Sequence, residues 1–285
     1  MVRTSSKYLD SISTYLSEFT LLLISLFCFL HLSDSVAVTY AQPQSNPQTQ
    51  QTNDSALMAG QTVERELKAG EGHSYRITLA SGQYLHIVVE QIGINVEVAI
   101  ANPKGEKLAS LDWWWREGAE SLWVLAESSG DYTLKVDASN KPDEMGKYRI
   151  KVEKIGDWQQ ASDTDRNYVN AYRNFAMGEK LLAQGTAESQ HAAIEKYQEA
   201  LKLWRTLKDA DAEAQALNAL GTIYYQSGNY KEGEEYISQA IPLFQKSGNH
   251  GGEADSRNTL GNIYNLSGQT QRAFDSYNQV LPLVR

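Results

Sequence analysis

The sequence contains one cysteine, Cys28, among 285 residues. It lies inside an apolar run near the N-terminus, so the rest of the chain has no thiol for a disulfide, a thiolate metal site or a cysteine nucleophile. The sequence also lacks a run of Lys or Arg, and its formal net charge is -9. Because nucleic-acid binding needs a basic face, nucleic acid is not expected as a partner.

Motifs for catalysis and metal binding are missing as well. The five histidines are scattered, without H-E-x-x-H or paired-ligand spacing, and no G-x-S-x-G, P-loop, G-x-G-x-x-G or EF-hand pattern occurs. The sequence therefore predicts that the protein is not an enzyme and uses no metal or cofactor.

An apolar run of fourteen residues, "FTLLLISLFCFLHL", stands near the N-terminus. It is shorter than the roughly 20 residues of a membrane span, Arg3 and Lys7 precede it, and the small residues Thr39 and Ala41 follow it. This pattern predicts an export signal peptide over residues 1–41 and a mature protein that is periplasmic, at the cell surface or secreted. The alternative is an uncleaved anchor, favoured by two acidic residues in a long n-region. The membrane is otherwise not expected as a partner.

Two segments of different character follow. Residues 42–55 contain Gln, Asn, Pro, Ser and Thr but no apolar residue, which predicts a disordered linker. Residues 56–157 contain eight short runs with period two, separated by turn sequences such as "NPKG" and "SSG". In "DYTLKVDA", Tyr132, Leu134 and Val136 share one face. The pattern predicts an antiparallel, all-β sandwich of jelly-roll type.

This segment resembles the pre-peptidase C-terminal (PPC) domain, a small bacterial β-sandwich. The matching motifs are Tyr75 with residues 82–85, the "NPKG" hairpin at 102–105, and the "GDYTLKV" strand at 130–136. They are structural glycines, prolines and core aromatics, so the resemblance implies the fold and leaves the function open.

Two similar nonapeptides, "LGTIYYQSG" and "LGNIYNLSG", stand forty residues apart in the last part of the chain. Gly221 and Gly261 are predicted to lie where the two helices of a pair come close, and Gly228 and Gly268 to end the first helix of each pair. This is a tetratricopeptide (TPR) pattern with a repeat of 40 residues.

A fainter first copy of the repeat contains Gly178. Helix pairs of this kind bury their apolar faces only by stacking, so about three are needed for stability. Residues 158–285 are therefore predicted to form an all-α TPR solenoid of three repeats, the last one truncated. Its uncapped end is a candidate surface for self-association.

The first helices of a TPR stack line a concave groove. Asn and Gln side chains offer a donor and an acceptor to an extended peptide. The predicted partner-binding residues lie a turn either side of the signature glycine: Gln215, Asn218, Thr222, Tyr225, Asp255, Asn258, Asn262 and Asn265. The alternative is that these residues form solvated helix faces without a partner.

The sequence "DWWWR" contains three consecutive tryptophans, Trp113, Trp114 and Trp115. In an extended segment the outer two share one face and the middle one takes the other, so at least one is expected to be exposed. Such a platform could stack on sugar rings or on a peptide. The alternative is two core tryptophans and one on the domain surface.

The order of export signal, PPC-like sandwich and TPR repeats resembles the N-terminal half of a bacterial family that continues with more repeats and a CHAT domain. That domain is a caspase-like peptidase with a His–Cys pair, and the present sequence contains no such segment. We expect a non-catalytic, exported scaffold that binds a peptide or a partner protein in the TPR groove. The alternatives are the regulatory arm of a CHAT peptidase and a carbohydrate-binding module built on the tryptophans.

Overall fold

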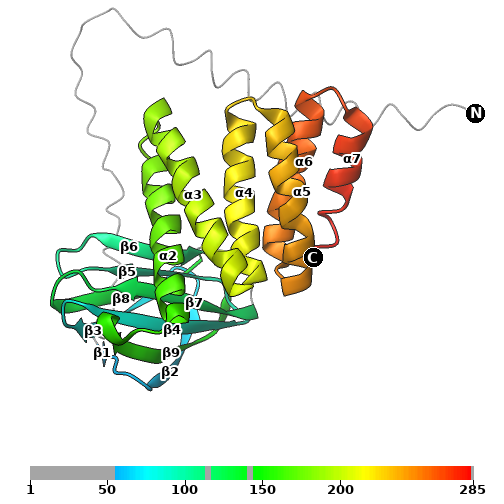
Figure 1. Ribbon diagram of the computed structural model, residues 1–285. Helices are drawn as coiled ribbons and strands as arrows, with labels where there is room; N and C mark the ends of the chain where they lie inside the picture. The colour runs from blue at the N-terminus through cyan, green and yellow to red at the C-terminus, as the bar shows by residue number, and fades with distance from the viewer. Residues whose placement is uncertain (1–54, 113–116, 140–143, 284–285) are drawn as a thin grey trace, which may run out of the picture. The chain divides into compact units, whose positions relative to one another are not determined.

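The computed structural model describes residues 55–112, 117–139 and 144–283, all of which belong to one compact unit, Thr49–Arg285 (Figure 1). The predicted signal peptide, nearly all of the predicted linker and the three tryptophans of "DWWWR" lie outside the described residues. Within the described ranges, no helix is long and apolar enough to cross a membrane.

The first part of this unit is a sandwich of two β-sheets. One sheet has the strand order β1-β3-β8-β5-β6 and the other β2-β9-β4-β7. All neighbouring strands are antiparallel except β1, which pairs parallel to β3. The strands are β1 (Ser55–Ala56), β2 (Thr62–Lys68), β3 (Gly72–Leu79), β4 (Gln83–Ile92), β5 (Val96–Ala101), β6 (Lys107–Asp112), β7 (Glu117–Leu125), β8 (Gly130–Ala138) and β9 (Met145–Asp157).

Apolar and polar residues alternate along the strands, so the apolar side chains point into the core between the two sheets. In β8, Tyr132, Leu134 and Val136 are each at most 1% exposed, as their period of two predicts. Strands from both sheets contribute to one apolar cluster of this kind. The predicted all-β sandwich is confirmed; the two-residue strand β1 adds a ninth strand to the eight expected.

The second part consists of six helices in three hairpins that follow one another in chain order (Figure 1). Each hairpin packs on the next, and the first helices of successive hairpins, α4 and α6, also touch. The helices are α2 (Asp163–Leu182), α3 (Ala187–Leu207), α4 (Ala210–Gln226), α5 (Tyr230–Ser247), α6 (His250–Leu266) and α7 (Thr270–Asn278), preceded by the short 3₁₀ turn η1 (Trp158–Gln160).

The signature glycines lie where the helices of a hairpin approach most closely. A Cβ on Gly221 would lie 2.6 Å from Ile237 Cγ1, and one on Gly261 would lie 2.4 Å from the ring of Tyr277. Gly228, which follows α4, has a φ of +82° that other residues rarely adopt. The predicted roles of these glycines agree with the geometry.

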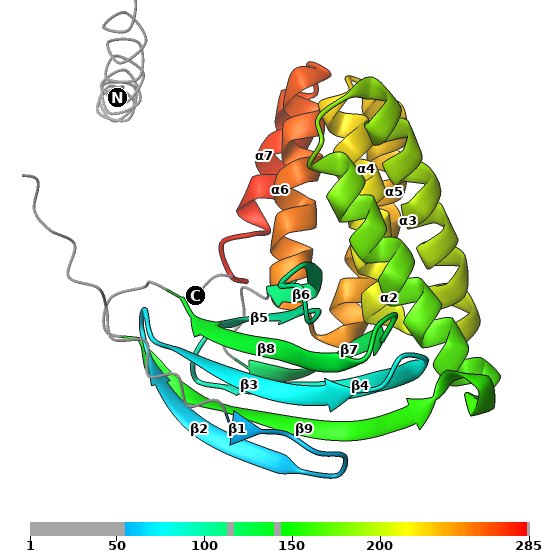
Figure 2. The ribbon, with the colours of Figure 1, turned by 90° about the vertical axis from the view of Figure 1, so that its left-hand side faces the viewer.

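An aromatic cluster joins the sandwich to the first hairpin, where α2 lies against β6 and β7 (Figure 2). The ring of Trp123 in β7 is stacked between His86 in β4, at 3.9 Å between centroids, and Tyr168 in α2, at 4.9 Å. Burial in this stack lowers the pKa of His86 to about 4. The imidazole is therefore neutral at physiological pH and serves as a packing surface.

A buried polar contact reinforces this junction. Asp165, near the start of α2, accepts hydrogen bonds from Tyr84 Oη in β4 at 2.9 Å and from Lys154 Nζ in β9 at 2.7 Å. Asp165 is 8% exposed, so its charge is well shielded from water. Together with the aromatic stack, it fixes α2 to the sandwich and thereby positions the first repeat.

Candidate functional site

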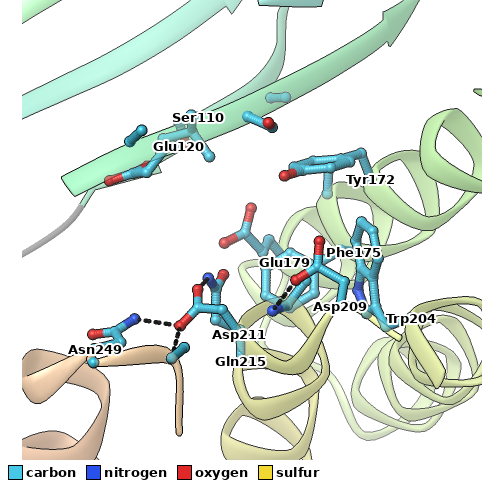
Figure 3. Close-up of a pocket in the computed structure, with 18 residues that line it drawn as sticks. Ser110, Glu120, Tyr172, Phe175, Glu179, Trp204, Asp209, Asp211, Gln215 and Asn249 are labelled. Atoms are coloured by element: carbon cyan, nitrogen blue, oxygen red, sulfur yellow. Dashed lines mark hydrogen bonds between the residues drawn. The ribbon is translucent and has the colours of Figure 1, made fainter. Parts of the chain in front are cut away.

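The main candidate site is a cavity of about 300 Å³ between the sandwich and the helical hairpins (Figure 3). Strands β6 and β7, the outermost strands of the two sheets, form one wall. Helices α2 and α4, the end of α3 and the turn from α5 to α6 form the other.

A second cavity of about 270 Å³ adjoins the first. It continues along α4 to the first turns of α6, and the two share Phe175, Glu179, Gln215 and Asn249 among their lining residues. We call the two cavities together the concave groove. It follows the first helices of all three repeats, so an elongated ligand could contact each of them.

Aromatic side chains form one part of the groove wall. Tyr172 and Phe175 from α2 and Trp204 from α3 line the first cavity, and the ring of Trp204 meets that of Tyr172 edge-on, with 4.9 Å between centroids. Trp204 is 2% exposed, and its Nε1 donates to no acceptor among the described residues. Figure 3 shows this indole beside Asp209, with its nitrogen on the side of that carboxylate.

Asp211, in the first turn of α4, is held by three donors. Gln215 Nε2 donates to one carboxylate oxygen at 2.8 Å, and Ser247 Oγ and Asn249 Nδ2 donate to the other at 2.9 Å each (Figure 3). Burial raises the pKa of Asp211, although these hydrogen bonds act in the opposite direction. The network ties α4 to the turn before α6 and fixes the position of the carboxylate.

Four further carboxylates line the groove. Glu120 comes from β7, Glu179 from α2, Asp209 from the start of α4 and Asp255 from α6. Glu179 and Asp255 are accessible to solvent, but the surrounding groove atoms desolvate them and raise the pKa of each. Asp209 caps α4, accepting from the backbone N–H of Ala212 at 3.2 Å.

The described residues that line the two cavities include no Lys, Arg or His. Within the described ranges, no set of three or more His, Cys, Asp and Glu side chains could hold a metal ion. The arrangement is suited to binding through aromatic faces and carboxylates.

Three of the eight residues predicted from the sequence lie together in this groove. Gln215, Asn218 and Asp255 line the second cavity, and Gln215 also lines the first. Asn218 accepts a hydrogen bond from Ser256 Oγ at 2.9 Å, which links α4 to α6.

The other five predicted residues line neither cavity. Tyr225 packs in the apolar cluster between the second and third repeats, and Asn262 accepts a hydrogen bond from Tyr277 Oη at 2.7 Å. Thr222 is half-buried, while Asn258 and Asn265 are exposed. Their role in binding stays a prediction.

The contribution of the first repeat to the groove was not predicted from the sequence. Gln215, Asn218 and Thr222 stand six residues before, three before and one after Gly221. The same offsets from Gly178 give Tyr172, Phe175 and Glu179, all of which line the groove. The internal repeat therefore contains the information needed to predict these three residues. No such signal existed for the residues of β6 and β7, whose place depends on docking between distant parts of the chain.

Comparison with known proteins agrees with the helical architecture. The tetratricopeptide repeat family model matches residues 191–245 and 212–285. No curated protein sequence matches the chain.

Solved structures similar to part of the chain include three that are each at most 20% identical to it. The TPR domain of Arabidopsis FLU is 20% identical, covers 41% of this chain and 95% of its own, and has a TM-score of 0.38. The second TPR of Spaghetti (RPAP3), bound to the HSP90 peptide SRMEEVD, is 20% identical, with coverages of 41% and 95% and a TM-score of 0.34.

The third is the pre-peptidase C-terminal domain of a collagenase from Bacillus anthracis. It is 18% identical, covers 35% of this chain and 95% of its own, and has a TM-score of 0.29. The hairpin geometry, the signature glycines and the family match lead to one conclusion: the C-terminal part of this chain carries tetratricopeptide repeats.

Proposed function

We propose that this protein is a non-catalytic scaffold for protein–protein interaction, whose concave groove holds a peptide or an extended segment of a partner. The observation that carries the proposal is the continuity of the two cavities along α2, α4 and α6. Their combined lining offers aromatic surface, amides and carboxylates from three successive repeats, which suits a ligand longer than a single side chain.

Polar groups in the groove support recognition of a peptide backbone. The Gln215 and Asn218 side chains each keep hydrogen-bonding capacity beyond their single contacts, because an amide has two N–H donors and an oxygen with two lone pairs. An extended peptide carries unpaired N–H and C=O groups that match such side chains.

We also propose that the protein is exported. The support is the short apolar run with Arg3 and Lys7 before it and small residues after it. N-terminal sequencing of the mature protein from culture fractions would test this proposal, and recovery of an intact Met1 from the soluble cytoplasm would contradict it.

The remaining hypotheses stay predictions. Membership of the CHAT family, and hence a regulatory arm of a peptidase, rests on the resemblance alone; a downstream reading frame with a His–Cys peptidase would support it. Sugar-dependent quenching of tryptophan fluorescence would support a carbohydrate site at Trp113–Trp115. Self-association is favoured by Phe274 and Leu281 in the last repeat, which are 60% and 55% exposed, and sedimentation velocity tests it.

The scaffold proposal is tested by selecting random dodecapeptides displayed on phage against the full chain. Selected peptides should slow amide hydrogen exchange in α2, α4 and α6. Replacing Gln215 and Asn218 together by Ala should weaken the binding of the selected peptides about tenfold, which is the effect of losing one or two hydrogen bonds.

The matched control is Gln198→Ala, because Gln198 is exposed on α3 and lines neither cavity. This variant should bind like the unmodified chain. Failure to select any peptide, or equal affinity for the Gln215/Asn218 variant, would refute the proposal.

A further inference from the structure

A third cavity, of about 120 Å³, lies beside the two that form the concave groove. Strands β6 and β7, at the edges of the two sheets, form its two sides, and α2 covers it. Ala109 and Tyr172 line both this cavity and the first cavity of the groove. Because an apolar cavity of about 150 Å³ holds a molecule of the size of benzene, this one suits a single branched or aromatic group.

The inner wall of the third cavity is apolar. Val124 and Tyr132 belong to the core cluster between the sheets, and Leu108 packs against that cluster. Val169 adds an aliphatic surface from α2. The Tyr132 hydroxyl already has a partner, because it donates to the backbone oxygen of Ser128 at 2.9 Å. An apolar ligand group would therefore extend the packing of the sandwich core and would leave water in doing so.

The rim of the third cavity carries one pair of opposite charges. Arg173 in α2 donates from Nη2 to Oε1 of Glu127, in the turn after β7, at 2.8 Å. The two side chains are 57% and 71% exposed, so a ligand at the rim can reach both. A guanidinium has several N–H donors and a carboxylate several acceptor positions, so this hydrogen bond leaves most of their capacity unused. An exposed ion pair also contributes little to stability, and a ligand can replace it at small cost.

An α-amino acid carries the same two charges close together, with its side chain beside them. Its carboxylate matches the Arg173 guanidinium, its ammonium matches the Glu127 carboxylate, and an apolar side chain matches the inner wall. We propose that the third cavity binds a free apolar α-amino acid with a branched or aromatic side chain, such as leucine or phenylalanine. This site goes beyond the proposed function, since its ligand is a small molecule that binds outside the concave groove.

Isothermal titration calorimetry with the full chain tests the ligand, at about 0.15 M salt to screen distant charges. Leucine, phenylalanine or both should bind. Glycine should bind about tenfold or more weakly, because it has no side chain to bury. If neither leucine nor phenylalanine binds, or if glycine binds as tightly as they do, the proposal is overturned.

Derivatives of the better ligand test the recognition of its two charges. The N-acetyl derivative lacks the ammonium and the amide derivative lacks the carboxylate, so each should bind about tenfold more weakly. If either binds as tightly as the amino acid, the site does not recognise the zwitterion and the proposal fails. A dipeptide with the same N-terminal residue followed by alanine is the last comparison. Tighter binding of this dipeptide would assign the site to a peptide N-terminus and refute a free amino acid.

Two variants test the rim. Arg173→Gln and Glu127→Gln should each weaken the amino acid about tenfold, because each removes one charge-assisted contact. The matched controls are Arg205→Gln and Glu195→Gln, since both residues are exposed on α3 and line none of the three cavities. The controls should bind like the unmodified chain. Equal losses in the rim variants and the controls would show non-specific attraction and refute the site.

A third variant tests the cavity itself. Leu108→Trp places a larger ring in the cavity wall and should abolish binding of the amino acid. Should this variant fail to fold, as measured by circular dichroism, Ser128→Trp at the exposed rim serves the same purpose. Unchanged affinity in a folded variant would refute the location of the site. The two proposals fail separately, because selected peptides test the groove and amino acids test the third cavity.

Discussion

Replacing Gly221 by Ala is expected to destabilise the second repeat. An added Cβ would lie 2.6 Å from Cγ1 and 2.7 Å from Cδ1 of Ile237, and 3.1 Å from the backbone nitrogen of that residue. Carbon atoms prefer separations of about 3.5–4.0 Å, so α4 and α5 would have to separate by roughly 1 Å. Rotation of the Ile237 side chain cannot relieve the contact between the added Cβ and the backbone nitrogen of Ile237.

Two effects of opposite sign determine how much Gly221→Ala changes the free energy of unfolding. Overpacking a closed core costs about 1–3 kcal/mol, and Ile237 is completely buried. Alanine is a better helix former than glycine by about 1 kcal/mol, which offsets part of that cost. We expect a net loss of about 1–2 kcal/mol in the free energy of unfolding, or a Tm lower by about 2–8 °C.

Thermal unfolding followed by circular dichroism at 222 nm measures this change. Gln226→Ala, on the exposed side of the same helix, is the control for helix propensity and should not lower the Tm. Ile237→Ala should cost about 2–5 kcal/mol alone but less in the Gly221→Ala background, because it removes the clashing atoms. A Tm of Gly221→Ala at or above that of the unmodified chain would refute the close-approach argument.

Two further perturbations address the sandwich and its junction with the helices. Burial tends to raise the pKa of Asp165, but hydrogen bonds from Lys154 and Tyr84 outweigh burial and lower that pKa in the folded protein. The ionised Asp165 therefore stabilises the fold fully above its unfolded pKa of about 3.9. This stabilisation is lost as the pH falls through the pKa of Asp165 in the folded protein. Asp165→Asn should lower the free energy of unfolding by about 1–2 kcal/mol at neutral pH; the loss is no larger because Lys154 is half-exposed. In urea unfolding, the variant's free energy of unfolding should depend less on pH below about 4 than that of the unmodified chain. The same pH dependence in both proteins would contradict this. Tyr148→Phe should cost about 1–3 kcal/mol, because it removes the hydroxyl that bonds both His73 Nδ1 and Tyr75 Oη; equal midpoints in urea would disprove the loss.

The strands and hairpins could be predicted from the sequence because each has a local signal. Tyr132, Leu134 and Val136 alternate with polar residues, and Gly221 and Gly261 repeat at a fixed interval, so neither required knowledge of distant residues. The strand β1 could not be predicted. It has two residues, and only its pairing beside β3 makes it a strand.

The candidate site was predictable in part, for a similar reason. Gln215, Asn218 and Asp255 follow from the repeat offsets, and Glu179 follows once the offsets are extended to the first repeat. Ser110 and Glu120 come from strands that reach the groove only because Trp123, Tyr168 and Asp165 dock α2 on the sandwich. Sequence periodicity describes single elements, whereas this wall is produced by tertiary contacts.

The docking of α2 on β6 and β7 also affects solubility. The edge of a β-sheet presents unpaired backbone groups that can template the addition of another chain, and a covering helix is one way in which proteins prevent this. Strand β2 is at the other edge of the sheet that contains β7, and it carries the charged residues Glu64, Arg65, Glu66 and Lys68. Such charges also discourage edge-to-edge association. Release of the repeats from the sandwich would therefore uncover two edges at once, so the same aromatic junction that shapes the groove should also protect the chain from aggregation.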